Sequence, residues 1–223
     1  MGITVDLQNA STDIDFANAT IRSGGSTNLG DFVVTGTSGA FDASAVTFDN
    51  LRIITLTSAC TLSNCLINDC GQVTVASADL SGSTVSNSSA ASALLWDTNV
   101  DPNGELDNMT FIMGSTNSHA IELGSNTPST ISLTGHSYTG YAASDGSNGD
   151  EVIYNNSAKA ITINILGGGD TPTIRNGASA STTIVNNTSV TLTGLVNPTE
   201  VRVYETGTST EVAGEENVTT GSF

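Results

Sequence analysis

A small or apolar residue recurs at every fifth position within one stretch of the chain, and this spacing restricts the fold more than any other feature. Neither an α-helix, with about 3.6 residues per turn, nor a strand, with a period of two, repeats in this way. This period is instead expected of a chain that winds around a core and turns one side chain inward on each short face. The residues are Cys60, Cys65, Cys70, Val75, Leu80 and Val85. The spacing predicts a β-solenoid, in which each coil buries its apolar edge against the next.

Elsewhere apolar and polar residues alternate over short segments, which is typical of strands with one buried face. The clearest examples are residues 3–7, 14–16, 32–34, 46–48 and 161–165. Clusters of Gly, Ser, Asn and Asp between such segments supply the turns. The likeness of residues 46–53 to 106–112 indicates coils of roughly 20 residues or somewhat more. We therefore expect an all-β protein whose residues 1–188 form a parallel β-helix (β-solenoid).

The pattern changes near Thr188. We expect residues 189–223 to form a small antiparallel β-strand module for assembly, with strands at 189–195, 200–205 and 210–213 and breaks at Asn197-Pro198 and Gly207. About 35 residues are too few for an independent β-sandwich. The module is therefore expected to dock on the solenoid, to pair with another copy, or to continue past Phe223.

The chain is strongly acidic, with 5 Lys and Arg against 22 Asp and Glu and a formal net charge of -17. Such a surface repels phosphate backbones and anionic lipids, so we expect neither nucleic acid nor membrane as a partner. No apolar run is long enough for a transmembrane helix, and the N-terminal residues lack the layout of a signal peptide. An extracellular role would then require another route, such as release within a particle.

Cys60, Cys65 and Cys70 are the first candidates for chemistry. An odd number argues against a disulfide framework, and zinc sites use four ligands at paired short spacings. The three thiols are in phase with Val75 and Leu80, so we expect them to pack in the core, since free Cys behaves as a small apolar residue.

One segment offers oxygen ligands on alternate residues around a glycine, as Ca²⁺ requires. These candidate ligands are Asp97, Asn99, Asp101, Asn103, Glu105 and Asp107. The segment departs from an EF-hand because Pro102 stands at the sixth position and Asn108 at the twelfth. We favour a plain solvated turn, because Asp and Asn form turns without a metal. Residues 145–151 are a similar case, and we expect no resident metal or cofactor.

A catalytic set is not expected, and neither is enzyme activity. Asp49, Asp69 and Asp79 fall on neighbouring coils and would serve glycoside hydrolysis only if two of their carboxyls came close together on one face. His119 and His136 accompany no nucleophile motif and are interpreted as surface or turn residues. Trp96 is placed in the core rather than at a subunit contact, and Gly167-Gly168-Gly169 is interpreted as a tight turn.

Several segments of the last third of the chain resemble β-helical virion proteins of tailed bacteriophages, marine phages in particular. These are residues 160–176, 190–195, 200–204 and 210–216. The resemblance implies a fibre, spike, decoration or tail-appendage protein, located in the virion, that acts by assembly and surface attachment. Its expected partners are other virion proteins and copies of itself, most naturally as a homotrimer. A tailspike that binds or degrades host surface glycan, and a bacterial surface adhesin module, remain the alternatives.

Overall fold

The computed structural model describes residues 2–24, 30–114, 118–142, 149–186, 192–196, 199–204 and 209–218. The regular secondary structure of these residues is entirely β. The described residues contain no helix that is long and apolar enough to cross a membrane. The chain divides into two compact units, Met1–Asn187 and Thr188–Phe223. The boundary expected from the sequence lies between residues 188 and 189.

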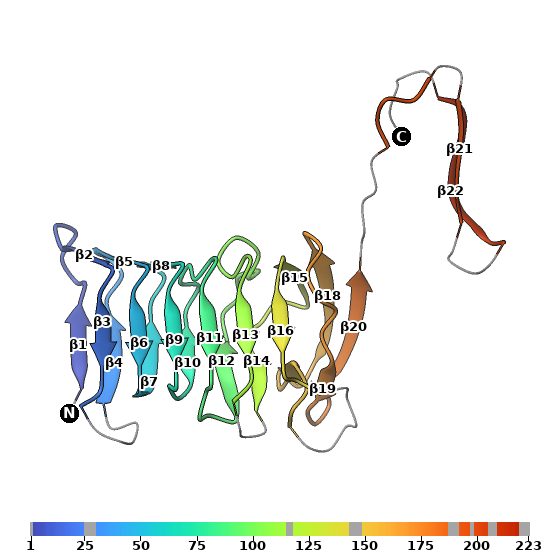
Figure 1. The fold of residues 1–223 in the computed structure, drawn as a ribbon. Coiled ribbons are helices and arrows are strands. Elements are labelled where there is room, and N and C mark those ends of the chain that lie inside the picture. The colour runs from blue at the N-terminus through green and yellow to red at the C-terminus, as the bar shows by residue number, and fades with distance from the viewer. Residues whose placement is uncertain are drawn as a thin grey trace. The chain divides into compact units, whose positions relative to one another are not determined.

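The first unit is a parallel β-helix with three faces, which confirms the expected fold class (Figure 1). Face 1 is one continuous sheet of β1 (Ile3–Asp6), β4 (Gly30–Thr35), β7 (Leu51–Leu56), β10 (Val73–Val75), β12 (Ser92–Trp96), β14 (His119–Leu123), β17 (Ile153–Asn155) and β19 (Ile174–Asn176). Face 2 holds β2 (Asp13–Ala17), β5 (Ala40–Ser44) and β8 (Cys60–Ser63), and later β15 (Thr130–Thr134), β18 (Ala160–Leu166) and β20 (Ser181–Asn186). Face 3 consists of β3 (Thr20–Arg22), β6 (Thr47–Asp49), β9 (Leu66–Asn68), β11 (Thr84–Ser86), β13 (Thr110–Ile112) and β16 (Ser137–Thr139).

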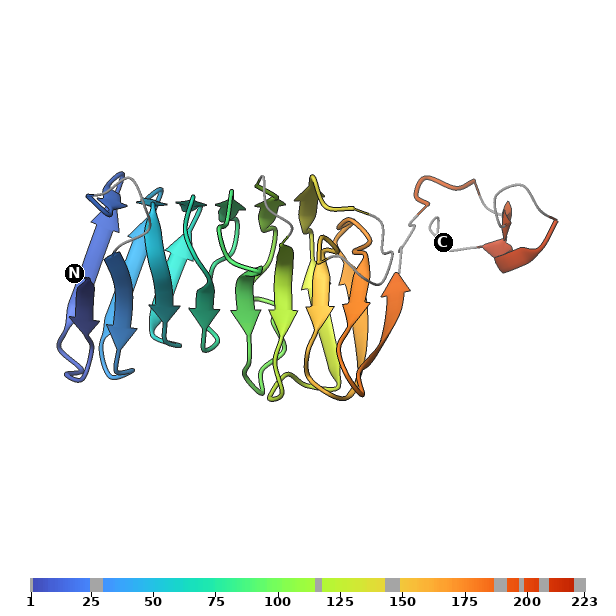
Figure 2. The same cartoon turned by 90° about the horizontal axis from the view of Figure 1, so that it is seen from below.

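The chain visits face 1, face 2 and face 3 in turn and then begins the next coil, so every strand pairs in parallel with its counterpart one coil away (Figure 2). Phe48 lies opposite Ile67, which occupies the same place in the next coil. The interval is much longer between Ile121 and Ile153, because the later coil carries a longer loop. The expected coil of roughly 20 residues is therefore correct around Phe48, and other coils contain insertions.

All six residues of the five-residue repeat are buried, with at most 2% of each exposed. They belong to one hydrophobic core that extends from Leu7 to Ile165. Near its beginning Phe32 contacts both Phe41 and Phe48, with ring centroids 5.5 and 5.3 Å apart. Apolar burial is the main stabilising term for such a stack, because no single coil can cover its own inner edge.

The corners between faces explain why Asn or Asp precedes Cys65 and Cys70 of the repeat. Asn64 and Asp69 adopt φ values of 53° and 50°. Asn and Asp enter this left-handed region more readily than most residues, so they turn the chain sharply between two strands. The same role falls to Asn50, Asn87 and Asn108 in other coils. Thr74 and Thr84, which also precede buried residues of the repeat, lie inside strands instead.

Face 2 continues without regular strands between β8 and β15. Thr61 forms an isolated bridge with Asp79, and the Leu80 amide donates to the carbonyl of Glu105 over 2.6 Å. The Gly82 amide donates in the same way to Asp107. The acidic segment proposed for Ca²⁺ is therefore itself one side of a coil.

The second unit contains an antiparallel pair, β21 (Thr199–Tyr204) and β22 (Glu211–Val218). Arg202 joins the two strands, because it contacts Glu200 on its own strand and Glu211 on the partner strand. The strands expected near 200–205 and 210–213 are thus present. Residues 192–195 do not form the expected strand, and residues 189–191 lie outside the described part of the chain.

Candidate functional site

A hollow opens in unit 1 where face 3 loses its regular pairing. After β18 the chain turns through Gly167-Gly168-Gly169 and passes β16 as an irregular segment instead of a strand. Pro172 in that segment has no N–H to donate to a sheet. The amide of Tyr138 in β16 donates to the carboxylate of Asp170, 3.0 Å away, where a backbone carbonyl would otherwise accept. A side chain thus replaces the strand that would have covered β16.

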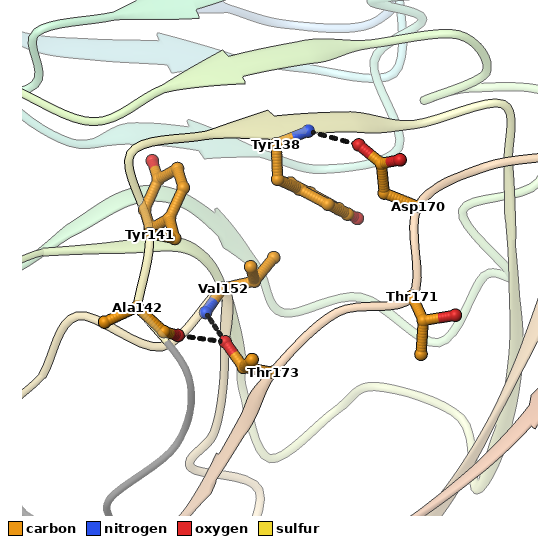
Figure 3. A pocket seen from close by; sticks show the side chains of 7 residues that line it. All are labelled: Tyr138, Tyr141, Ala142, Val152, Asp170, Thr171 and Thr173. Carbon is orange, nitrogen blue, oxygen red and sulfur yellow. Dashed lines mark hydrogen bonds between the residues drawn. The ribbon is translucent and has the colours of Figure 1, made fainter.

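The resulting tyrosine hollow has a volume of about 420 Å³ (Figure 3). Tyr138 and Tyr141 line one side, and Asp170, Thr171 and Thr173 line the other. The Thr173 hydroxyl donates to the carbonyl of Ala142 over 2.8 Å and accepts from the amide of Val152 over 3.0 Å. These two bonds fix the floor of the hollow, so its walls are preformed.

Electrostatics keep the tyrosines neutral. Burial raises the pKa of Tyr138 and of Tyr141 above the ordinary phenol range, and the nearby Asp170 carboxylate adds to the effect at Tyr138. Both phenols therefore carry their protons at neutral pH and are able to donate hydrogen bonds. Aromatic rings beside a carboxylate and hydroxyl groups form the kind of lining that holds a small polar ligand with a flat apolar face.

His136 lies behind Tyr138 and is only 3% exposed, so its interpretation as a surface or turn residue is wrong. The Tyr138 hydroxyl lies 3.0 Å from Nδ1 of His136, and Nε2 is buried with no hydrogen-bond partner among the described residues. Burial lowers the pKa of His136 to about 4. A signal in the sequence could have indicated this burial. His136 directly follows the corner residue Gly135, just as the buried Cys65 directly follows the corner residue Asn64.

His119 is also buried, at 2% exposure, so it too was misplaced by the sequence interpretation. Its Nδ1 lies 2.7 Å from the carbonyl oxygen of Glu151, and its Nε2 lies 3.3 Å from the guanidinium of Arg175. The Glu151 side chain is fully buried, and neither of its carboxyl oxygens has a hydrogen-bond partner in the described ranges. Its Oε2 lies 3.9 Å from Nδ1 of His119.

The segment proposed for Ca²⁺ uses several of its oxygens to accept hydrogen bonds, most of them from the next coil. Asp97 accepts from the amide of Asn126 and Asp101 from the amide of Ser132, each over 2.7 Å. In addition, Asn103 accepts from the Thr134 hydroxyl, and Asp107 and Asp101 accept from the backbone amides of Gly104 and Asn103. Glu105 has one buried oxygen without a partner among the described residues, and burial raises its pKa.

These contacts spread the oxygens along the coil. Among the residues that the structure describes, the segment brings no three carboxylates within 4.8 Å of one another. Asn99 lies in the same loop, and residues 145–148 of the second candidate segment lie outside the described part of the chain. Residues 98–100 and 102–108 form bends and turns on this side of the coil.

A different acidic group was missed by the sequence reasoning. Asp13 and Asp15 on β2 and Asp42 on β5 place carboxylate oxygens within 4.8 Å of one another, and all three are exposed. The parallel register sets Asp15 directly opposite Asp42. Oxygen ligands of this kind suit a divalent cation. Only the pairing of strands from successive coils brings these carboxylates together, so no local sequence motif predicts the group.

The three carboxylates considered for glycan hydrolysis do not share a face. Asp49 ends β6 on face 3, where it pairs with Arg22 over 2.9 Å and accepts a hydrogen bond from Asn68. Asp69 occupies a corner, and Asp79 bridges to Thr61 on face 2. The alignment on one face that hydrolysis would need is absent from these three, because the coil near them has three short sides and the residues fall on different ones.

The core residues predicted from the sequence are where they were expected. Cys60, Cys65 and Cys70 are free and buried, and burial raises the pKa of each thiol, for Cys70 to about 12. Trp96 is fully buried, and its indole N–H donates to the carbonyl of Val100 over 3.1 Å. Comparison of the chain with protein-family models, curated proteins and solved structures gave no match.

Proposed function

We propose that the chain is a structural component of a bacteriophage particle, such as a fibre, spike, decoration or tail-appendage protein, that acts by assembly and surface attachment. The single core that extends from Leu7 to Ile165 through successive coils of unit 1 is the observation that best supports this proposal. Each coil is bonded to the next along two or three faces, so bending the stack would break many backbone hydrogen bonds together. A solenoid with this construction transmits force along its axis.

The second unit supplies a surface suited to assembly. Leu192, Val196 and Tyr204 are exposed, with Val196 at 81%, and Val201 is its single buried apolar residue in the described ranges. A two-stranded sheet is marginal by itself in water. Pairing with other copies, most naturally in a homotrimer, would cover these apolar side chains within a closed cyclic symmetry, as homo-oligomers usually have.

The proposal is tested by the particle and by the purified protein. Electron microscopy of virions labelled with antibodies against residues 1–187 should show the protein at a regular position on the head or tail. Light scattering of the full chain should give three times the monomer mass of 22.6 kDa. A deletion of residues 188–223 should return unit 1 as a folded monomer. Absence of the label from purified virions would overturn the virion role, and a monomeric full chain would overturn the trimer.

A second function, glycan binding, is favoured by the tyrosine hollow. Sugar rings stack their apolar face on aromatic side chains, and their hydroxyls bond to carboxylate and hydroxyl groups such as those of Asp170 and Thr171. We would test this with galactose and N-acetylglucosamine in saturation-transfer NMR. The variant Tyr141→Leu should remove the signal, and Tyr204→Leu in unit 2 should keep it. An equal signal in both variants would contradict glycan binding at the hollow.

A further inference from the structure

A second, smaller hollow of about 220 Å³ lies on face 1 and belongs to neither the tyrosine hollow nor the proposed assembly surface. Its polar lining comes from four successive strands of that face: Ser92 on β12, His119 and Glu122 on β14, Tyr154 on β17 and Arg175 on β19. The parallel register sets Ser92 opposite His119, Glu122 opposite Tyr154, and Tyr154 opposite Arg175. Residues far apart in the sequence are thereby held in one place by backbone pairing.

Arg175 stands apart from the other arginines of this acidic chain. Arg22, Arg52 and Arg202 each form an ion pair with a carboxylate. Within the described residues Arg175 forms none, although the chain has 22 acidic residues. Its guanidinium carbon lies 4.8 Å from the centre of the Tyr154 ring. The group is held by an aromatic face and a histidine rather than by a negative charge.

The histidine contact fixes how the guanidinium is presented. His119 Nδ1 lies 2.7 Å from the Glu151 carbonyl oxygen, which can only accept, so Nδ1 carries the proton. In the neutral ring Nε2 is then an acceptor, and it takes one N–H of Arg175 at 3.3 Å. The His119 ring also stacks on Tyr154, with centroids 5.1 Å apart. A guanidinium has five N–H donors, so this arrangement positions it firmly and leaves donors for a ligand.

We propose that this hollow binds a carboxylate-bearing ligand of the size of one sugar acid, with the carboxylate on Arg175. The planar guanidinium matches a carboxylate with two parallel hydrogen bonds, and its stacking on Tyr154 reduces the entropy lost on binding. Glu122 and Ser92 line the same hollow and serve the hydroxyl groups of the ligand, Glu122 as an acceptor. The side-chain amide of Asn156 donates a hydrogen bond to the Glu122 carboxylate over 2.9 Å and holds that carboxylate in place.

The charge of the lining selects among anions. Glu122 places a negative charge in the hollow, which repels a dianion such as phosphate more strongly than a monoanionic carboxylate. A sugar acid offers one carboxylate and several hydroxyl donors, so it satisfies Arg175 and Glu122 together. The hydrogen phosphate dianion offers a single hydroxyl donor. We therefore expect D-glucuronate to bind more tightly than inorganic phosphate. We also expect it to bind more tightly than D-glucose, which has the same ring without the carboxylate.

The test compares D-glucuronate with D-glucose by NMR titration of the full chain. Wild-type protein should bind D-glucuronate at least tenfold more tightly than D-glucose, because a hydrogen bond to a charged group contributes about a tenfold to hundredfold change in affinity. Arg175→Gln should remove this preference. Arg22→Gln is the matched control, since it makes the same change in net charge at an exposed arginine on face 3. It should leave the affinity within about twofold of wild type.

Two further measurements keep the test decisive. Arg175→Lys retains the charge and loses the planar fork, so it should bind D-glucuronate more weakly than wild type and more tightly than Arg175→Gln. Thermal unfolding of each variant shows that the solenoid is intact. Equal binding of D-glucuronate and D-glucose by wild type, or equal loss in Arg175→Gln and Arg22→Gln, would overturn the proposal. A glucuronate-containing hexasaccharide that binds more tightly than the free sugar acid would identify a polysaccharide as the source.

Discussion

Acid should destabilise unit 1 through His136, and the size of the effect follows from its burial. The residue is 3% exposed, its Nε2 has no partner in the described ranges, and burial lowers its pKa from 6.5 to about 4. The unfolded chain therefore binds a proton that the folded chain excludes between these two values. The stabilisation is complete above pH 6.5 and is lost as the pH falls toward 4. At 1.36 kcal/mol per pKa unit, the loss between pH 7 and 4.5 is about 2–3 kcal/mol.

The assay is urea unfolding followed by the fluorescence of Trp96, the single and fully buried tryptophan. Wild type and His136→Leu are each measured at pH 7 and at pH 4.5. Leucine fills the site without a titrating group. The pH-independent effect of the substitution on the unfolding free energy is therefore measured at pH 7. The decrease in unfolding free energy between the two pH values should be about 2–3 kcal/mol smaller in His136→Leu than in wild type. Equal decreases in the two proteins would refute the reasoning, as would an NMR titration that shows His136 protonated at pH 6.

Three other predictions concern the solenoid core and its packing. A methyl group added by Gly71→Ala would collide with the Arg52 carbonyl oxygen, so it should lower the unfolding free energy by about 1–3 kcal/mol or more, whereas Gly24→Ala points into open space and should be neutral. Leu62→Ala should cost about 2–5 kcal/mol in the same urea assay, because Leu62 is fully buried, and a cost under about 1 kcal/mol would contradict the packed core. The three thiols should react with a thiol reagent only after unfolding, since burial raises their pKa and excludes the reagent; rapid labelling of native protein would contradict this.

The architecture was predictable because the signals for it are local and repeated. The period from Cys60 to Val85 reports one inward side chain on each short side, and burial of all six residues bears this out. The cysteines and Trp96 were assigned to the core, and the structure places them there. Asn64 and Asp69 mark corners, because their side chains tolerate the left-handed backbone that a sharp corner needs.

The two hollows were not predictable, since each is assembled by pairing between coils. Arg175 reaches His119 across 56 residues, and Tyr138 meets Asp170 across 32. Coil lengths differ widely, because the interval from Ile121 to Ile153 is far longer than the one from Ile67 to Val85. No fixed period therefore tells which side chains become neighbours. His119 was misplaced for this reason, because its burial depends on the coil stacked beside it, whereas the position of His136 directly after a corner was an overlooked local signal.

The amino-acid sequence by itself determined that this chain winds into a β-solenoid, because inward and outward positions alternate along each short strand and small polar residues turn the corners. The tertiary structure alone decided which coils meet, and with them the tyrosine hollow, the Arg175 hollow and the exposed group of Asp13, Asp15 and Asp42. The physical reason is that strand pairing fixes register between distant segments, whereas a local pattern reports only which face of a strand is buried.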